Sequence, residues 1–243
     1  MYVEPFGGGF SVGFAKRPVK SEVYNDLESE VFNLFRTVRE RGDELAQLIN
    51  MTPYSREELM LAYEPCECSL ERARRFYVRA WIAIKTTSHN KYTGFRAAVN
   101  SDDNCSHALS WSKSAEVLLE IRKRLARVII ENCNAFDLFA RYDFSTTLWY
   151  LDPPYINSTR GSVSVKRGYL HNMTDEEHLQ LCQRIKKLKG MVMLSGYDNP
   201  LYNEQLEGWQ KAEIAARDDA NKDRVECLWM NFASGRQLSF MDS

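Results

Sequence analysis

Short apolar runs and a helical period alternate over the first forty residues. Residues 2–3 and 23–24 are apolar runs typical of buried strands, whereas residues 28–41 carry apolar side chains at every third or fourth position. A glycine-rich stretch and a short helical pattern over residues 10–15 separate the two runs. The order strand, glycine loop, helix, strand, helix predicts the start of a doubly wound α/β domain.

The middle of the chain has a different pattern, without strand alternation or internal repeats. The spacing of apolar residues predicts helices over residues 43–50, 55–63, 69–86 and 112–127. Residues 87–111 are polar and are predicted to form a loop. Phe76 and Trp81 have helical spacing, which favours a place in the core over a role in binding.

The α/β alternation then resumes and continues to the end of the chain. Further strands are predicted over residues 128–130, 147–151, 191–194, 209–215 and 225–231, with helices over 135–141 and 174–188. The total is about seven strands in a Rossmann-like sheet. A strand-to-strand passage needs about 30 residues, but 126 residues separate Asp26 from Asp152. We therefore predict one α/β domain, residues 1–44 and 126–243, carrying a mainly helical insertion over residues 45–125.

Charge is distributed unevenly although the net charge of the chain is only −1. Residues 73–127 hold 11 Lys/Arg and 4 Asp/Glu, a net of +7, which leaves −8 for the remainder. Such a segment indicates either a phosphate-binding region or a solvated basic helix face, and charge alone favours neither. The candidate phosphate contacts, inside the segment and after it, are Arg74, Arg75, Arg79, Lys85, Lys91, Arg96, Lys113, Arg160, Lys166 and Arg167.

Several classes of protein are excluded or disfavoured by the sequence. No run approaches 18 apolar residues and the N-terminus lacks a signal-peptide pattern, so we expect no membrane association and a cytoplasmic location. Of six cysteines only Cys66 and Cys68 lie close together, which favours reduced thiols over a metal site. His171 and His178 have no cluster of ligands around them, and no metal is expected.

The first strand runs directly into the loop Glu4-Pro5-Phe6-Gly7-Gly8-Gly9, which precedes a helix. Glycines at such a place let a ligand approach the backbone closely, although a tight turn is the simpler reading. The loop lacks the Gly-Lys-Ser/Thr of a phosphate-binding loop, and Glu4 would repel a pyrophosphate. Asp26, at the end of the second strand, is placed to accept hydrogen bonds from ribose hydroxyls.

The most specific motif is Asp152-Pro153-Pro154-Tyr155, directly after an apolar strand. Two prolines fix the backbone, so that the Asp152 carboxylate and the Pro153 carbonyl can face one point. Both groups are acceptors and suit an exocyclic amino group, which has two protons to donate. Tyr155 offers a flat face on which a base can stack. The alternative for this motif is a rigid turn.

Together these motifs identify a resemblance. The chain resembles an adenine-N6 DNA methyltransferase of the Dam-like group, dependent on S-adenosylmethionine. The matching segments are 2–9, 25–27, 152–155 and Ser195-Gly196-Tyr197, in the alpha order of glycine loop, target-recognition insertion and Asp-Pro-Pro-Tyr. The resemblance covers both ends of the chain and little of the insertion.

The resemblance implies roles for individual residues. S-adenosylmethionine would be held by Glu4, Pro5, Phe6, Gly7, Gly8, Gly9, Asp26, Asn134, Ala135 and Asp152. Asn134 stands where the family usually has Asp, so we expect weaker cofactor binding. The target base would be flipped out of the duplex, and Asp152, Pro153, Pro154 and Tyr155 would form the catalytic pocket. The Asp at position 152 favours adenine over the alternative, cytosine-N4 methylation.

Double-stranded DNA is the implied partner. The expected DNA contacts are Lys91, Tyr92, Arg96, Lys113, Arg160, Lys166 and Arg167, and Asn90, Tyr92 and Arg96 could reach base edges. Family members usually carry a segment before the first strand, and its absence would leave part of one sheet face uncovered. We therefore expect that a preceding segment or a partner chain completes the cofactor site, or that the fold compensates. A DNA-binding relative without catalysis is the alternative from another class.

Overall fold

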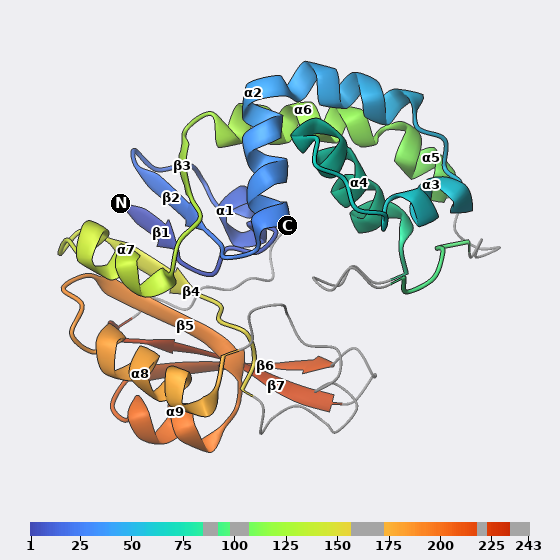
Figure 1. Cartoon of the computed structure of the whole chain (residues 1–243). Helices are drawn as coiled ribbons and strands as arrows, with labels where there is room; N and C mark the ends of the chain where they lie inside the picture. The colour runs from blue at the N-terminus through green and yellow to red at the C-terminus, as the bar shows by residue number, and fades with distance from the viewer. Residues whose placement is uncertain (85–91, 98–106, 157–172, 218–222, 234–243) are drawn as a thin grey trace.

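A computed structural model describes residues 1–84, 92–97, 107–156, 173–217 and 223–233 (Figure 1). Its centre is a sheet of seven strands in this described part of the chain, in the order β3-β2-β1-β4-β5-β7-β6. The strands are β1 (Tyr2–Glu4), β2 (Glu22–Asn25), β3 (Val128–Glu131), β4 (Leu148–Leu151), β5 (Met191–Tyr197), β6 (Gln210–Arg217) and β7 (Asp223–Met230). The first five strands are parallel, and β7 is antiparallel to both β5 and β6. The predicted α/β class and strand count are confirmed.

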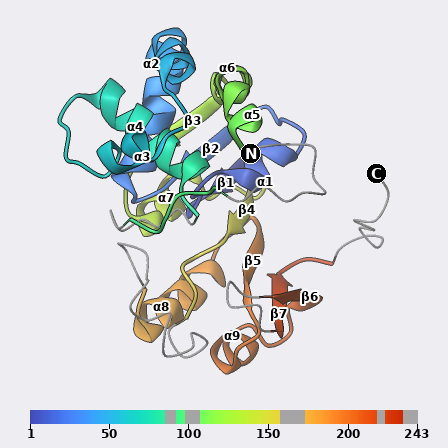
Figure 2. The same cartoon turned by 90° about the vertical axis from the view of Figure 1, so that its right-hand side faces the viewer.

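Helices cover both faces of this sheet. They are α1 (Ser11–Ala15), α2 (Ser29–Met51), α3 (Arg56–Leu61), α4 (Ser69–Ile82), α5 (His107–Ser112), α6 (Ser114–Leu125), α7 (Ala135–Tyr142), α8 (Asp175–Ile185) and α9 (Pro200–Gln205). Helices α2 to α6 gather at the β2–β3 end of the sheet, whereas α8 and α9 lie beside β5 and β7 (Figures 1 and 2). The molecule is thus a three-layer α/β fold with a helical extension at one end.

Two hydrophobic clusters hold these layers together. One lies between the sheet and α1, α2 and α6, and it continues through α3, α4 and α5. The other lies between the opposite face and α7, α8 and α9. Alternate residues of β4 serve the two faces, since Trp149 and Leu151 belong to the second cluster while Tyr150 packs against the first. The helical extension therefore shares a core with the sheet, and the predicted boundaries of the insertion, 45–125, stay a prediction.

Strand β1 is covered on both faces by this chain. Tyr2 belongs to the first cluster and Val3 to the second, with exposed fractions of 3% and 0%. The prediction of an uncovered sheet face is therefore wrong at β1. Helix α2 packs on α4 and α6, and its N-terminal half brings Phe35 against Tyr24 of β2. A helix already present in the chain supplies the cover.

Three predicted helices differ from the observed ones. The two helices expected over 28–41 and 43–50 form the single element α2, which has non-helical backbone angles at Arg41 (φ −136°, ψ 33°). The helix expected over 69–86 ends at Ile82, because Ala83 forms an antiparallel bridge with Phe95 and the Ile84 amide donates to the Gly94 carbonyl at 3.0 Å. Backbone pairing with a distant segment ends this helix, and local periodicity carries no signal for it.

Two helices were not predicted. Helix α5 begins inside the polar stretch 87–111 and is held by a buried side chain, Trp111, whose indole donates to the Thr52 carbonyl at 2.8 Å. Helix α9 begins with Pro200 and is capped by Asn199. Both are six residues long, which is too short to show a helical period. The helix predicted over 174–188 is confirmed as α8, which begins with a capping box formed by Thr174 and Glu177.

Candidate active site

The carboxyl ends of β1 and β4 meet at the place where the strand order of the sheet reverses. From β1 the sheet extends to β2 and β3 on one side, and to β4 and β5 on the other. Open α/β sheets bind ligands outside the carboxyl ends of the strands at such a switch point. The glycine loop follows β1 and the Asp-Pro-Pro-Tyr segment follows β4, so the two predicted ligand-binding segments come from neighbouring strands at one edge.

The glycine loop is pinned to the end of β2. The Gly7 amide donates to the Asn25 carbonyl at 2.8 Å, and the Tyr24 hydroxyl donates to the Gly8 carbonyl at 2.9 Å. A Cβ atom at Gly7 would collide with the Tyr24 ring, whereas at Gly9 it would meet nothing within 4 Å. Gly8 has a φ of +46°, a conformation that glycine adopts at low cost. The loop is therefore tightly fixed at Gly7 and open at Gly9.

Asp26 fastens the same loop by its side chain. One carboxylate oxygen accepts from the Gly8 amide at 2.7 Å, and the other accepts from the Glu28 amide at 2.7 Å. Each carboxylate oxygen has a further acceptor site. Asp26 thus orients the loop, and its free lone pairs can still receive a ligand's hydroxyl groups.

Asn25, to which the sequence analysis assigned no role, joins two candidate loops. Its buried amide donates to the Pro5 carbonyl at 2.8 Å and to the Cys133 carbonyl at 3.0 Å, and its oxygen accepts from the Cys133 amide at 2.9 Å. Asn134, which follows Cys133 in the chain, caps α7 through its side-chain oxygen, which accepts from the Phe136 amide at 2.9 Å. The loop after β3 is thereby attached to the glycine loop.

Predicted cofactor residues near this junction differ in exposure. Ala135 is buried, with 5% of its surface exposed, whereas Asn134 lies open to solvent. Phe6 packs against the second hydrophobic cluster. The Asn134 oxygen already serves the helix cap, so a ligand's amino group would have to share it.

Glu4 is a buried carboxyl group at the end of β1. Only 2% of the residue is exposed, and the Tyr2 hydroxyl donates to its carboxylate. Burial raises the pKa of Glu4 to about 7; the Tyr2 hydrogen bond and the Lys16 charge oppose this shift, and the nearby Asp152 charge adds to it. Glu4 and Asp152 therefore form an acidic pair across the switch point.

The Asp-Pro-Pro-Tyr segment is anchored between β4 and the second hydrophobic cluster. Pro153 is buried, as is Ile156 just after the motif, while Asp152 itself is reached by solvent. Partial desolvation still raises the pKa of Asp152; a hydrogen bond with the Ser195 hydroxyl lowers it, and the negative charge of Glu226 raises it. Asp152 is thus an acceptor at the mouth of the site, and its pKa depends on Ser195 of β5 and Glu226 of β7.

Tyr155 faces a second tyrosine. Its ring stacks on that of Tyr197 at the end of β5, with centroids 4.2 Å apart and planes inclined by 22°. Ser195 and Tyr197 had no predicted role. In the sequence they stood out only as part of Ser195-Gly196-Tyr197, one of the segments that match the family.

These groups fit S-adenosylmethionine chemically. The cofactor carries a sulfonium and an ammonium group, both cationic, together with ribose hydroxyls and an adenine amine. The site offers the carboxyl groups of Glu4, Asp26 and Asp152, all acceptors, and open space at Gly9 where a Cβ atom would meet no protein. An acceptor-rich edge with a glycine loop suits such a ligand.

Among the predicted DNA contacts, three lie in the described part of the chain. Tyr92 is 47% exposed and packs edge-on to Tyr63, and Lys113 is exposed at the start of α6. Arg96 is half-buried, and its backbone amide donates to the Ile82 carbonyl at 2.9 Å. The remaining candidates fall outside the described residues: Lys85, Asn90, Lys91, Arg160, Lys166 and Arg167. His171, for which no metal role was predicted, also lies outside them.

Two candidate phosphate contacts, Arg74 and Arg79, are wrong, and a third, Arg75, stays a prediction. Arg74 and Arg79 are buried in the helical extension, with exposed fractions of 7% and 8%. Arg74 bonds to Glu58 and Glu71, Arg79 donates to the Ala62 carbonyl, and Arg75 bonds to Glu71. These guanidinium groups stabilise packing of α4. The core positions predicted for Phe76 and Trp81 are confirmed, because both pack against the first cluster.

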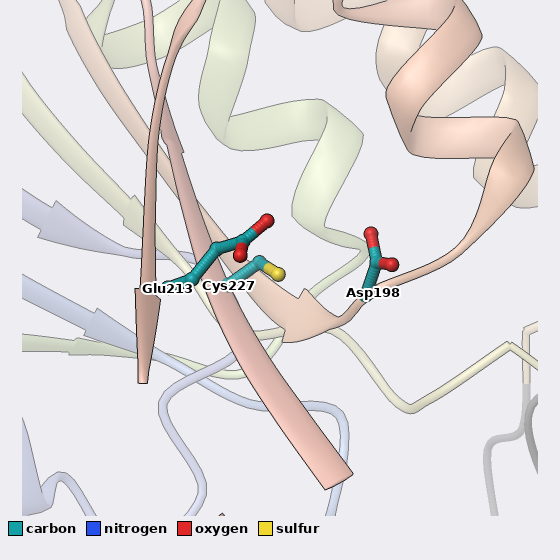
Figure 3. A group of neighbouring side chains, drawn as sticks. All are labelled: Asp198, Glu213 and Cys227. Carbon is teal, nitrogen blue, oxygen red and sulfur yellow. The ribbon is translucent and has the colours of Figure 1, made fainter. Parts of the chain in front are cut away.

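One group of potential metal ligands occurs among the described residues. Asp198 follows β5, and Glu213 and Cys227 belong to β6 and β7 (Figure 3). Their potential ligand atoms lie within 4.8 Å of one another. The Lys211 ammonium bonds to both carboxylates at 2.7 Å and so supplies the positive charge. His178 is buried and bonds to the Tyr202 hydroxyl at 2.7 Å, as expected of a polar core residue. The five described cysteines are free thiols, as predicted.

The strand order of this seven-stranded sheet is that of a Rossmann-like methyltransferase, and the two candidate loops lie at its switch point. The family model for D12 class N6 adenine-specific DNA methyltransferase matches residues 1–219. The chain belongs to this family. A search of the curated proteins gave no match.

Family membership establishes the reaction. D12 class enzymes transfer a methyl group from S-adenosylmethionine to the N6 amino group of adenine in DNA, with the base flipped out, and this chain is accordingly an adenine-specific DNA methyltransferase. The predicted family, reaction and methyl donor are confirmed, whereas the roles of individual residues stay predictions. No described helix is long and apolar enough to cross a membrane. The cytoplasmic location also stays a prediction.

Proposed function

We propose that the Asp152 carboxylate and the Pro153 carbonyl accept hydrogen bonds from the N6 amino group of an adenine flipped out of duplex DNA. The observation that carries this proposal is the position of Asp152, directly after β4 and beside Glu4 at the switch point. Two acceptors match the two protons of an exocyclic amine. Tyr155, whose ring is partly exposed, provides the stacking surface.

The chain's own residues prepare the amine for transfer. Two acceptors on N6 raise its electron density and orient its lone pair away from Asp152 and Pro153. Asp152 has to be charged to act in this way, because a protonated carboxyl would offer a donor. S-adenosylmethionine, when bound, supplies an electrophilic methyl group, so neither a nucleophilic side chain nor a metal takes part in the proposed mechanism.

The cofactor site that we propose consists of the glycine loop and the loops after β2 and β3. Glu4 to Gly9 would contact the amino-acid part of the cofactor, and Asp26 the ribose. Asn134 and Ala135 would contact the adenine. The hydrogen bonds that join these loops through Asn25 and Asp26 support this grouping.

For DNA we propose contacts from the helical extension and from the segment after Asp-Pro-Pro-Tyr. Tyr92, Arg96 and Lys113 are the described candidates; Lys91, Arg160, Lys166 and Arg167 are the others. The extension and the β6–β7 pair lie on two sides of the carboxyl ends of β1 and β4 (Figure 1). A duplex held against both would bring its bases toward Asp152.

The test is the substitution Asp152→Asn, which keeps the size of the side chain but removes its charge. We expect methyl transfer to fall at least 100-fold, since general acid–base and electrostatic groups contribute about that much or more. Transfer of labelled methyl groups from S-adenosylmethionine to unmethylated duplex DNA is measured, and the product nucleoside is identified by mass. DNA binding by Asp152→Asn should stay within about threefold of the wild type.

Asp43→Asn is the matched control, since this carboxylate is exposed on α2 and pairs with Arg122. It should methylate DNA like the wild type. Full activity of Asp152→Asn would refute the catalytic assignment. Wild-type protein that binds DNA but yields no N6-methyladenine would instead favour the non-catalytic relative.

A further inference from the structure

Tyr155 and Tyr197 form a stacked pair at the mouth of the site. The two residues lie 42 positions apart in the sequence. Tyr155 comes shortly after β4, and Tyr197 is the last residue of β5, the neighbouring parallel strand. Their ring centroids are 4.2 Å apart. A third planar ring between them would need a separation of about 7 Å, twice the usual contact distance of roughly 3.5 Å. In this arrangement the face of Tyr155 toward Tyr197 is closed to a base.

The backbone of Tyr197 is fixed on both sides. It is the last residue of β5 and pairs with Glu226 of β7. The backbone amide of Asp198 donates to the Val225 carbonyl at 3.0 Å. The side-chain amide of the buried residue Asn199 donates to the Tyr197 carbonyl at 2.7 Å. The sheet and the cap of α9 therefore hold this tyrosine in place.

A cation also borders the Tyr197 ring. The Arg224 guanidinium lies over the ring, 5.8 Å from its centroid. A guanidinium near an aromatic ring is attracted by the ring quadrupole and limits the rotation of both groups. Tyr155, by contrast, receives its support from Pro154, which fixes only the backbone, and from Tyr197, through ring stacking and a side-chain hydrogen bond.

We propose that Tyr197 is a positioning residue for the methylation reaction. Its ring backs the ring of Tyr155, leaves the opposite face of Tyr155 as the stacking surface for the target adenine, and sets the distance from that surface to Asp152 and Pro153. The inference rests on the proposed stacking role of Tyr155. A stacking ring that is already immobile loses little freedom when the base arrives, so less binding energy is lost to ordering.

A double-mutant cycle tests this inference. The variants are Tyr155→Leu, Tyr197→Leu and the double variant, with kcat and KM measured on a duplex that the wild-type enzyme methylates. If Tyr197 acts through Tyr155, each single substitution lowers kcat about tenfold or more, and the double variant is about as slow as Tyr155→Leu. Independent effects would multiply to about 100-fold, which would overturn the inference.

Two further variants separate positioning from general stability. Tyr197→Phe keeps the ring and should recover most of the kcat lost in Tyr197→Leu. Phe144→Leu, which changes an exposed ring between α7 and the amino end of β4, is the matched control and should keep the wild-type kcat. A loss of kcat in Tyr197→Leu that Tyr197→Phe fails to recover would contradict the role of the ring.

The same cycle distinguishes this inference from the proposed function. Wild-type kcat in Tyr155→Leu would remove the stacking role of Tyr155, and the inference with it. A slow Tyr155→Leu beside a wild-type Tyr197→Leu would remove the positioning role alone. Faster methylation or tighter DNA binding by Tyr197→Leu would mean that Tyr197 occupies the place of the base, and would also overturn the inference.

Discussion

Two neighbours of Asp152 act on its carboxyl group in opposite directions. Beyond the effect of desolvation, the Ser195 hydroxyl lowers the pKa of Asp152, and the negative charge of Glu226 raises it. Backbone pairing within the sheet fixes both residues, since Ser195 of β5 pairs with Leu228 and Glu226 of β7 pairs with Tyr197. The charge state of the proposed acceptor is therefore controlled from two adjacent strands.

This balance predicts opposite shifts in the pH dependence of methyl transfer. Asp152 must be ionised, so activity falls on the acid side as its carboxyl becomes protonated. Ser195→Ala removes a donor, raises the pKa and moves this fall to higher pH. Glu226→Gln removes a negative charge, lowers the pKa and moves it to lower pH. The measurement is kcat/KM against pH, and shifts of the same sign in both variants would contradict the assignment.

Residue chemistry explains which parts of the site could be predicted from the sequence. Glu4 to Gly9, Asp26 and Asp152 to Tyr155 could be proposed as site residues because their types and order along the chain carry a chemical meaning. Asn25 and Tyr197 lie in segments that match the family but were given no role, because their contacts depend on partners that folding brings from other strands: Asn25 bonds to Cys133, 108 residues away. A single polar or aromatic residue at a strand end has no distinctive local pattern.

At the scale of elements, the loop after β1 combines one fixed and one open glycine, which allows a matched comparison. Gly9→Ala adds a methyl group where no protein atom lies within 4 Å, so stability should change by less than about 0.5 kcal/mol. If the cofactor occupies that space, its affinity falls about tenfold or more. Calorimetry of S-adenosylmethionine binding, beside a urea titration, measures both quantities.

Gly7→Ala is the counterpart, since its methyl group would overlap the Tyr24 ring. Overpacking of this kind costs about 1–3 kcal/mol, so this variant should lose stability as well as affinity. Unchanged affinity in Gly9→Ala would show that the loop turns without touching the cofactor.

Another link between elements is a buried ion group that joins α6 to the start of β2. Glu22 has no exposed side-chain surface and is bonded by Arg124 of α6 and by Lys16. Burial acts to raise the pKa of Glu22, but the hydrogen bonds from Arg124 and Lys16 outweigh it and lower the pKa. The group therefore stabilises the fold above the pKa that Glu22 has in the unfolded chain, and this contribution is lost as the pH falls through the folded value.

Arg124→Met tests this link. One partner of a fully buried carboxylate is removed, so we expect a loss of about 3 kcal/mol at neutral pH, at the lower end for broken buried pairs because Lys16 remains. The loss should shrink as Glu22 becomes protonated in acid. Urea titrations at several pH values measure it. Lys123→Met, whose ammonium pairs with Glu120 on the surface at 73% exposure, should change stability by less than about 1 kcal/mol.

At the scale of the whole molecule, much of the predicted basic segment is used internally. Arg74, Arg75 and Arg79 stabilise α4, and Arg122, Lys123 and Arg124 bond to acidic partners. Arg96, Lys113 and Arg127 have no acidic partner among the ion pairs of the described residues. A net charge of +7 over residues 73–127 therefore overstates the positive surface that DNA meets.

The salt dependence of DNA binding measures that surface. If Arg96 and Lys113 each contact one phosphate, Arg96→Ala and Lys113→Ala should each reduce the slope of log affinity against log salt by about 1. Lys187→Ala, beyond the end of α8 and near the start of β5, is the control and should leave the slope unchanged. Unchanged slopes in both test variants would move the DNA contacts to other residues.

The sequence predicted more of the structure of the sheet than of the helical extension. Strands in parallel α/β domains follow simple rules of burial and connection, so the count of about seven and the break in the middle followed from periodicity. In the extension, Trp111 binds to Thr52 across 59 residues and Ala83 pairs with Phe95. Tertiary contacts determine these helices, and they also merge the extension with the core of the sheet.

The position of β1 in the sheet has a consequence for how the protein is made. This three-residue strand pairs with β2 nearby, but its other neighbour is β4, where Tyr2 lies opposite Leu148. At about 5–20 residues per second, a ribosome needs roughly 7 to 30 s to add the chain between these partners. By the end of that time the helical extension has been made and can cover one face of β1, whereas the other edge and face wait for β4 and the elements after it. The nascent chain therefore holds a central strand with one unpaired edge, and the proposed catalytic segment can join the glycine loop only after β4 has been made.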